Sequence, residues 1–206
     1  MLYKMTGPDR TTYGGYQWPE IGEWDEVGKR AKAPLPKAAL CTTRVLHVTD
    51  ADHLLNWARE ELYEVEVDES RGIVTDGEKY GVRRARLVRR VETWNERTAR
   101  LFAADCPERV LPLFEKERPN DARPREAIAV ARRFAVGEAT REELAAACAA
   151  AWAARDAAGD AARAAARAAA GAAARDAWDA AWAAETAWQR ERLAQYLSGA
   201  ALDALR

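Results

Sequence analysis

The chain has 206 residues, of which 49% are hydrophobic and 32% are charged. This length and composition indicate a globular chain with room for one large or two small domains, and they exclude disorder throughout. Basic and acidic side chains number 32 and 33, so the net charge of -1 provides no overall attraction to DNA or to an anionic membrane.

Alanine is distributed unevenly, because 31 of the 47 alanines lie in the last 66 positions. Alanine has the highest helix propensity but a small side chain, so helices rich in it pack closely. We therefore predict the α+β fold class, with a small α+β domain over residues 1–97. An alanine-rich, all-helical bundle is predicted over residues 98–206.

The first strand is predicted over residues 2–6, and it ends at the turn residues Gly7, Pro8 and Asp9. Residues 43–48 alternate and contain β-branched side chains, which predicts a second strand. Thr49 and Asp52 resemble a capping box, and a helix is expected over about 50–59.

Two further strands are predicted in the first region. Residues 62–67 place Leu62, Glu64 and Glu66 on one face and apolar side chains on the other. Residues 82–94 form a longer predicted strand with arginines on both faces.

From about residue 98 the pattern becomes helical. A short helix is predicted over residues 98–104, and a second one starts at Asp105 and Pro107, since Asp is a favoured cap and Pro a favoured first helical residue. Pro112 is expected to kink this second helix.

The later helices carry clear boundary signals. Gly137 is predicted to cap the end of a helix, and Thr140 with Glu143 forms a capping box for the next one. Gly159 and Gly171 are predicted to break the alanine-rich tract.

The cysteines and the N-terminus point to the cytoplasm. Cys41, Cys106 and Cys148 are odd in number and far apart, so neither a disulfide framework nor a zinc ribbon is predicted, and we expect no metal and no cofactor. The first residues lack the pattern of a signal peptide. Charged residues interrupt the alanine tract, which argues against a membrane-spanning helix.

Polar residues gather where the second predicted strand meets its helix. Helix N-termini attract anions, so this junction is a favourable place for a ligand site, which we predict at Tyr3, Arg44 and His47. The alternative is that Thr49 and Asp52 only cap a helix while His47 lies on a strand face.

Five arginines in residues 82–90 form a second candidate site. Guanidinium groups bind phosphates and acidic partners through paired donors, and Arg84 and Arg86 are the predicted ligands. The alternative is a solvent-facing strand on which arginine discourages aggregation and pairs with Glu64, Glu66 and Glu78.

Tryptophans are the candidate partner contacts of the second region. Trp178, Trp182 and Trp188 recur along predicted helices, where they either fill the core or anchor an interface. The chain holds only two serines, Ser70 and Ser198, so a serine hydrolase triad is not indicated.

The second region resembles the alanine-rich immunity-protein domain found near bacterial toxin loci and in some phage genomes. The resemblance is carried by residues 106–115, then by Arg123 to Ile128, and then by alanine- and arginine-rich helices. The resemblance covers about residues 103–188. It implies stoichiometric neutralisation of a toxin or effector. Members often carry histidines in their last helices, and this chain has none there.

The first region resembles small α+β domains of phage and bacterial proteins, and Leu2 to Lys4 with a later strand ending in His47 resembles the opening of ADP-ribosyltransferase-like folds. Three hypotheses follow. The first is a non-enzymatic immunity or counter-defence protein that binds a toxin, a defence effector or its nucleotide signal. The second is an ADP-ribosyltransferase-like or nucleotide-binding enzyme with its site in residues 1–98. The third is a structural module that forms homo-oligomers.

Overall fold

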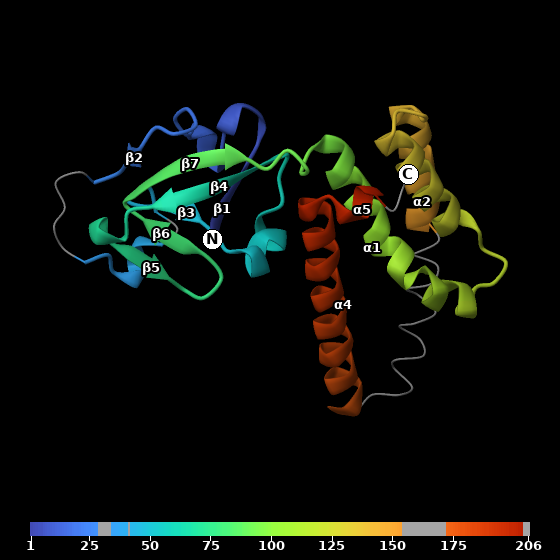
Figure 1. Cartoon of the computed structure of the whole chain (residues 1–206). Helices are drawn as coiled ribbons and strands as arrows, with labels where there is room; N and C mark the ends of the chain where they lie inside the picture. Colours follow the sequence, from blue (N-terminus) through green and yellow to red (C-terminus); the bar gives the residue numbers. More distant parts are fainter. Residues whose placement is uncertain (29–33, 41, 154–171, 204–206) are drawn as a thin grey trace. The chain divides into compact units, whose positions relative to one another are not determined.

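A computed structural model describes residues 1–28, 34–40, 42–153 and 172–203. The chain divides into two compact units, Met1–Asn95 and Glu96–Arg206. The first unit contains the strands and the second contains the α-helices (Figure 1). The predicted α+β fold class is therefore confirmed.

The strands of the first unit form two antiparallel sheets. The larger sheet has the order β1-β4-β7-β2 and the smaller one the order β3-β6-β5. The strands of the larger sheet are β1 (Leu2–Thr6), β4 (Glu61–Val67), β7 (Arg84–Arg90) and β2 (Asp25–Glu26). Those of the smaller sheet are β3 (Leu46–Val48), β6 (Tyr80–Val82) and β5 (Ile73–Thr75).

One bridge joins the two sheets. Tyr3 of β1 and Thr49, which follows β3, exchange two backbone hydrogen bonds of 2.7 and 2.9 Å. Side chains from both sheets then build one core, which includes Trp18, Tyr63 and Leu87. Each is at most 3% exposed, so their burial supplies much of the hydrophobic stabilisation of this unit.

The predicted strand over residues 43–48 is shorter in the structure, where it covers only β3. The Thr42 hydroxyl donates to the carbonyl of Ala39 and accepts from the backbone N–H of Arg44. These local bonds hold the chain in turns, because a threonine side chain competes with the sheet for backbone partners.

The predicted helix over 50–59 is a 3₁₀ helix, Ala51–Trp57. Its cap is Asp50 rather than Thr49, since the Asp50 carboxylate accepts the backbone N–H of His53 at 3.1 Å and lies 2.7 Å from His53 Nδ1. The Thr49 hydroxyl instead donates to the carbonyl of Glu78.

The long strand predicted over 82–94 is divided at Arg83, where the chain passes from the smaller sheet to the larger one. Arg83 is 7% exposed and its guanidinium donates to the carbonyl of Arg71 at 3.1 Å. Strands lie on both sides of this division, but β7 ends at Arg90, so the prediction of strand over residues 91–94 is wrong. The change of sheet depends on contacts distant in sequence.

The second unit is helical in its described part. It contains α1 (Glu96–Glu117), α2 (Arg123–Ala135), a helical stretch over residues 141–153, α4 (Ala172–Ser198) and the short α5 (Ala200–Asp203). None of these described helices is long and apolar enough to cross a membrane.

The prediction of two helices over residues 98–117 is wrong, because α1 runs through Asp105, Pro107 and Pro112 without a break. The Asp105 carboxylate accepts hydrogen bonds from distant side chains rather than capping a new helix.

Two other boundaries are confirmed. Thr140 and Glu143 exchange the two bonds of a capping box, at 2.7 and 3.1 Å, and Gly137 follows α2 with a φ of 81°. The breaks predicted at Gly159 and Gly171 lie outside the described residues.

Candidate functional site

A cavity of about 450 Å³ lies in the first unit, between β1 and β3. Its lining includes Lys4 and Met5 of β1 and all three residues of β3, beside the Tyr3–Thr49 bridge. Trp57, at the end of the 3₁₀ helix, and the loop residues Trp18 and Lys79 also line it. The volume falls within the range of about 300–1,000 Å³ that is usual for small-molecule sites.

Lys4 is the central cation of this cavity. Its ammonium nitrogen lies 5.8 Å from the centroid of the Trp18 ring, and it forms no ion pair with a carboxylate of the residues that the structure describes. Burial and, after it, the positive charge of Arg59 lower the pKa of Lys4 to about 8. An unpaired, partly buried ammonium attracts an anion strongly, because little water competes for it.

His47 stands beside the same charges. Burial lowers the pKa of His47, and the positive charges of Lys4 and Lys79 lower it further. The Lys79 ammonium lies 5.3 Å from the centroid of the Trp57 ring and 3.9 Å from an oxygen of Asp76. Strands β1 and β3 and the turn before β6 thus bring three basic side chains to one cavity.

The structure brings together two of the three residues predicted at this junction. Tyr3 and His47 both line the cavity, whereas Arg44 is exposed and does not line it. Sequence reasoning missed Lys4, Lys79 and Trp57. The rarity of lysine could have drawn attention to two of them. Only 6 of the 32 basic residues are lysines, and two of those six line the cavity.

Arg84 and Arg86 are held by acidic partners on neighbouring segments. Arg84 donates to Asp68 at 2.8 Å and Arg86 to Glu66 at 2.6 Å, and both guanidiniums lie over the ring of Trp24. This arrangement agrees with the pairing alternative for the strand. Neither residue lines the cavity.

In the second unit a buried carboxylate connects three helices. Asp105 of α1 is 4% exposed and accepts hydrogen bonds from Arg132 of α2 at 2.5 Å and from Arg192 and Tyr196 of α4 at 2.6 and 2.8 Å. The Tyr196 ring meets that of Phe102 edge to face. Because every oxygen of Asp105 is used in this way, we interpret the cluster as a structural junction.

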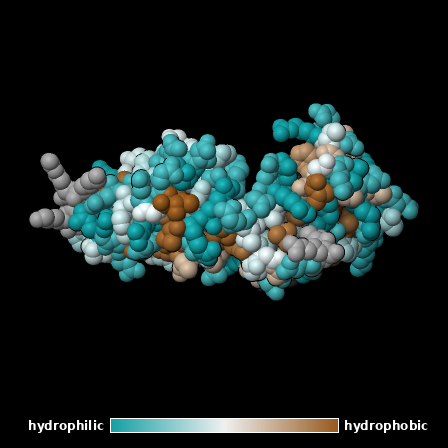
Figure 2. Space-filling view, turned by 45° about the horizontal axis from the view of Figure 1, so that its top comes forward, coloured by the Kyte–Doolittle hydropathy of each residue, from teal (hydrophilic) through white to brown (hydrophobic). Residues whose placement is uncertain are grey.

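The three tryptophans predicted as partner contacts lie on α4. Trp182 is 67% exposed, and Trp188 is partly buried with the Arg109 guanidinium 5.5 Å from its ring centroid. The side chain of Trp178 lies outside the described part of the structure. The surface in Figure 2 is mainly hydrophilic with scattered hydrophobic patches. A second tryptophan of this unit, Trp152, is 58% exposed.

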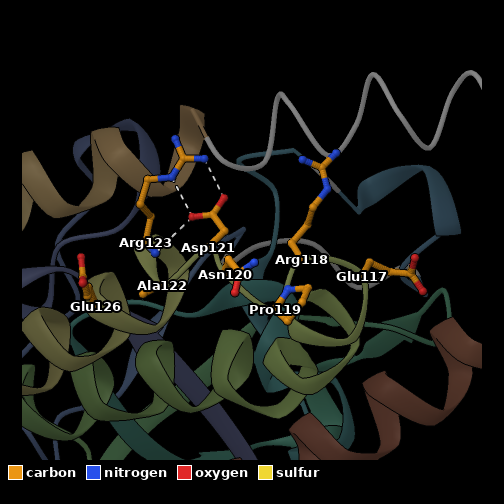
Figure 3. A pocket seen from close by; sticks show the side chains of 8 residues that line it. All are labelled: Glu117, Arg118, Pro119, Asn120, Asp121, Ala122, Arg123 and Glu126. Atoms are coloured by element: carbon orange, nitrogen blue, oxygen red, sulfur yellow. Dashed lines mark hydrogen bonds and ion pairs between the residues drawn. The ribbon is translucent and has the colours of Figure 1, made fainter.

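A second hollow, of about 560 Å³, follows the turn between α1 and α2. Its residues come from one short stretch, and the guanidinium of Arg123 faces the carboxylate of Asp121, while Glu117 and Arg118 point away from this pair (Figure 3). Both charges of the pair are satisfied, so the hollow offers less to a ligand than the cavity of the first unit.

A comparison with known protein families gives a match that lies mostly in the second region. Residues 89–177 match the family described as Imm-5 like putative immunity protein. The suspected immunity-protein domain is therefore confirmed. The match contains α1 and α2 and begins within β7, and the described residues that line the cavity all lie before it in the sequence. Searches of curated proteins and of solved structures gave no match.

Proposed function

We propose that this protein neutralises a protein toxin or effector by binding it in a stoichiometric complex. The observation that carries the proposal is the match of residues 89–177 to an immunity-protein family. A protein of this kind works by occupying its target, so it needs a stable surface rather than a reactive group.

The helical unit is proposed to supply that surface. The junction at Asp105 fixes the C-terminal half of α4 against α1, which keeps this helix in place without a partner. Trp182, on the same helix, is 67% exposed and is the proposed anchor. Large aromatic side chains contribute disproportionately to binding free energy when a partner buries them.

The compartment proposed for this activity is the cytoplasm. The described cysteines, Cys106 and Cys148, are free thiols, which suits a reducing compartment.

Native mass spectrometry tests the proposal. The tagged full chain is purified from its own host, and we expect a one-to-one complex of the 22.8 kDa chain with a single protein. That protein must arrest growth when it is expressed alone in a bacterial host. A chain that purifies alone, a harmless partner, or a complex made only of copies of this chain would overturn the proposal, and the last result would favour an oligomerisation module.

A further inference from the structure

The cavity of the first unit combines positive charge with aromatic walls. Lys4, His47, Arg59 and Lys79 all contribute to its lining, and the described lining residues include no aspartate or glutamate. Arg59 forms an ion pair with the carboxylate of Glu60 at 3.6 Å, and Lys79 forms one with the carboxylate of Asp76 at 3.9 Å. Neither Glu60 nor Asp76 lines the cavity. The interior is therefore selective for anions.

The aromatic side chains define the rest of the ligand. Trp18, which is 2% exposed, and Trp57 each hold a lysine ammonium over one ring face, and Tyr3 and Tyr16 also line the cavity. The indole Nε1 of Trp57 is buried and has no hydrogen-bond partner in the described structure. Buried donors are normally satisfied, so an orphaned one in a cavity wall indicates that a ligand acceptor completes it.

Other basic side chains of this unit lack these properties. Arg86 and Arg89 each form paired contacts with a glutamate of β4, so their charges are already compensated. The Lys4 ammonium, by contrast, lies over the Trp18 ring and forms no ion pair with a carboxylate of the described residues. Leaving an ammonium partly buried without a carboxylate costs folding free energy, and a bound anion would offset that cost.

We propose that this cavity binds a small phosphate ester with one aromatic ring system, of the nucleoside monophosphate class. The phosphate contacts Lys4, His47 and Lys79, and the ring lies among the aromatic walls with an acceptor on Trp57 Nε1. A phosphate group carries about -1.5 to -2 charges at neutral pH, which matches several cations better than a single carboxylate does. The site is separate from the proposed toxin-binding surface, because all its residues lie between positions 3 and 79.

Isothermal titration calorimetry with the full chain at pH 7 provides the test. The probes are AMP, UMP and 4-nitrophenyl phosphate, with adenosine and inorganic phosphate as controls that lack either the charge or the ring. We expect at least one probe to bind at least tenfold more tightly than both controls. Quenching of tryptophan fluorescence is expected to follow the same titration, since Trp18 and Trp57 line the cavity.

Matched substitutions locate the binding. Lys4→Met and Lys79→Met are each expected to weaken binding at least tenfold, whereas Lys116→Met, the same change on an exposed position of α1, leaves it unchanged. Far-ultraviolet circular dichroism confirms that each variant is folded. If none of the three probes binds, if the controls bind equally well, or if Lys4→Met and Lys79→Met bind as the wild type does, the proposal is wrong. Lys4→Met is expected to bind the toxin as the wild type does, whether or not the cavity binds a phosphate ester. A failure of the cavity proposal therefore does not count against the proposed toxin binding.

Discussion

The hydroxyl of Tyr196 donates a 2.8 Å hydrogen bond to the carboxylate of Asp105, and both side chains are almost fully buried. The two residues are 91 positions apart, so this bond fixes the C-terminal half of α4 on α1. Arg192, one turn earlier on α4, donates to the same carboxylate oxygen at 2.6 Å.

Tyr196→Phe removes this hydroxyl and keeps the ring. We expect the helical unit to lose about 1.5–3 kcal/mol of unfolding free energy, the usual contribution of a hydrogen bond to a charged group. Urea titration followed by circular dichroism at 222 nm measures the loss. A change below about 0.5 kcal/mol would show that Arg132 and Arg192 hold Asp105 without the tyrosine.

Asp105→Ala has a larger predicted effect. It leaves the guanidinium of Arg192 without this buried carboxylate and that of Arg132 with only Glu108, and breaking a buried pair costs about 3–5 kcal/mol. Glu96→Ala is the control, because Glu96 is exposed at the start of the same helix and its ion pair with Arg100 contributes about 0–1 kcal/mol. Equal effects of the two substitutions in the same urea titration would contradict the role given to Asp105.

Lys4→Met is predicted to stabilise the first unit by about 1–3 kcal/mol at pH 7, since it removes a partly buried charge that has no carboxylate partner among the described residues. The folded pKa of about 8 lies below the unfolded value of 10.5, so between these pH values the unfolded chain binds more protons. The contribution of Lys4 to wild-type stability therefore becomes more favourable as pH rises across this window.

The advantage of Lys4→Met should accordingly shrink from pH 8 to pH 10.5. Thermal unfolding of both proteins at several pH values measures this difference, and other titrating groups cancel in the comparison. A stability difference that stays constant with pH would mean that Lys4 is not desolvated.

Trp182→Ala tests the proposed binding surface. The side chain is 67% exposed, so the free protein should keep its stability within about 0.5 kcal/mol. A central aromatic anchor contributes at least about 2 kcal/mol, and the toxin complex should therefore weaken about thirtyfold in a calorimetric titration. Val136→Ala, a change at an exposed apolar residue after α2, is expected to leave affinity unaltered.

Local sequence signals predicted the elements that local contacts determine. The Thr140–Glu143 capping box depends on neighbours within a few positions and occurs as expected. The strand over residues 2–6 is also confirmed, because the turn residues after it mark its end, although its pairing partner β4 is distant in the sequence. Asp105 followed by Pro107 carried an equally good signal for a helix start. That prediction failed because partners 27, 87 and 91 positions away occupy the carboxylate, and no local pattern encodes them.

The sequence likewise predicted only some of the residues of the candidate site. Tyr3 and His47 stand on two predicted strands, the first marked by the turn residues that end it and the second by alternating side chains, so their place beside the cavity was partly expected. Lys4 and Lys79 are 75 positions apart, and only the pairing of β3 with β6 and the Tyr3–Thr49 bridge bring them to one cavity. Sheet order was not predictable from the sequence, and neither was this cluster.

Growth rescue measures the proposed neutralisation most directly. The protein captured by the chain is expressed in a bacterial host alone, with the wild-type chain and with Trp182→Glu at equal levels. We predict arrest when it is expressed alone, full growth with the wild type and poor rescue by Trp182→Glu, although that variant folds normally. Failure of the wild-type chain to restore growth would contradict the account.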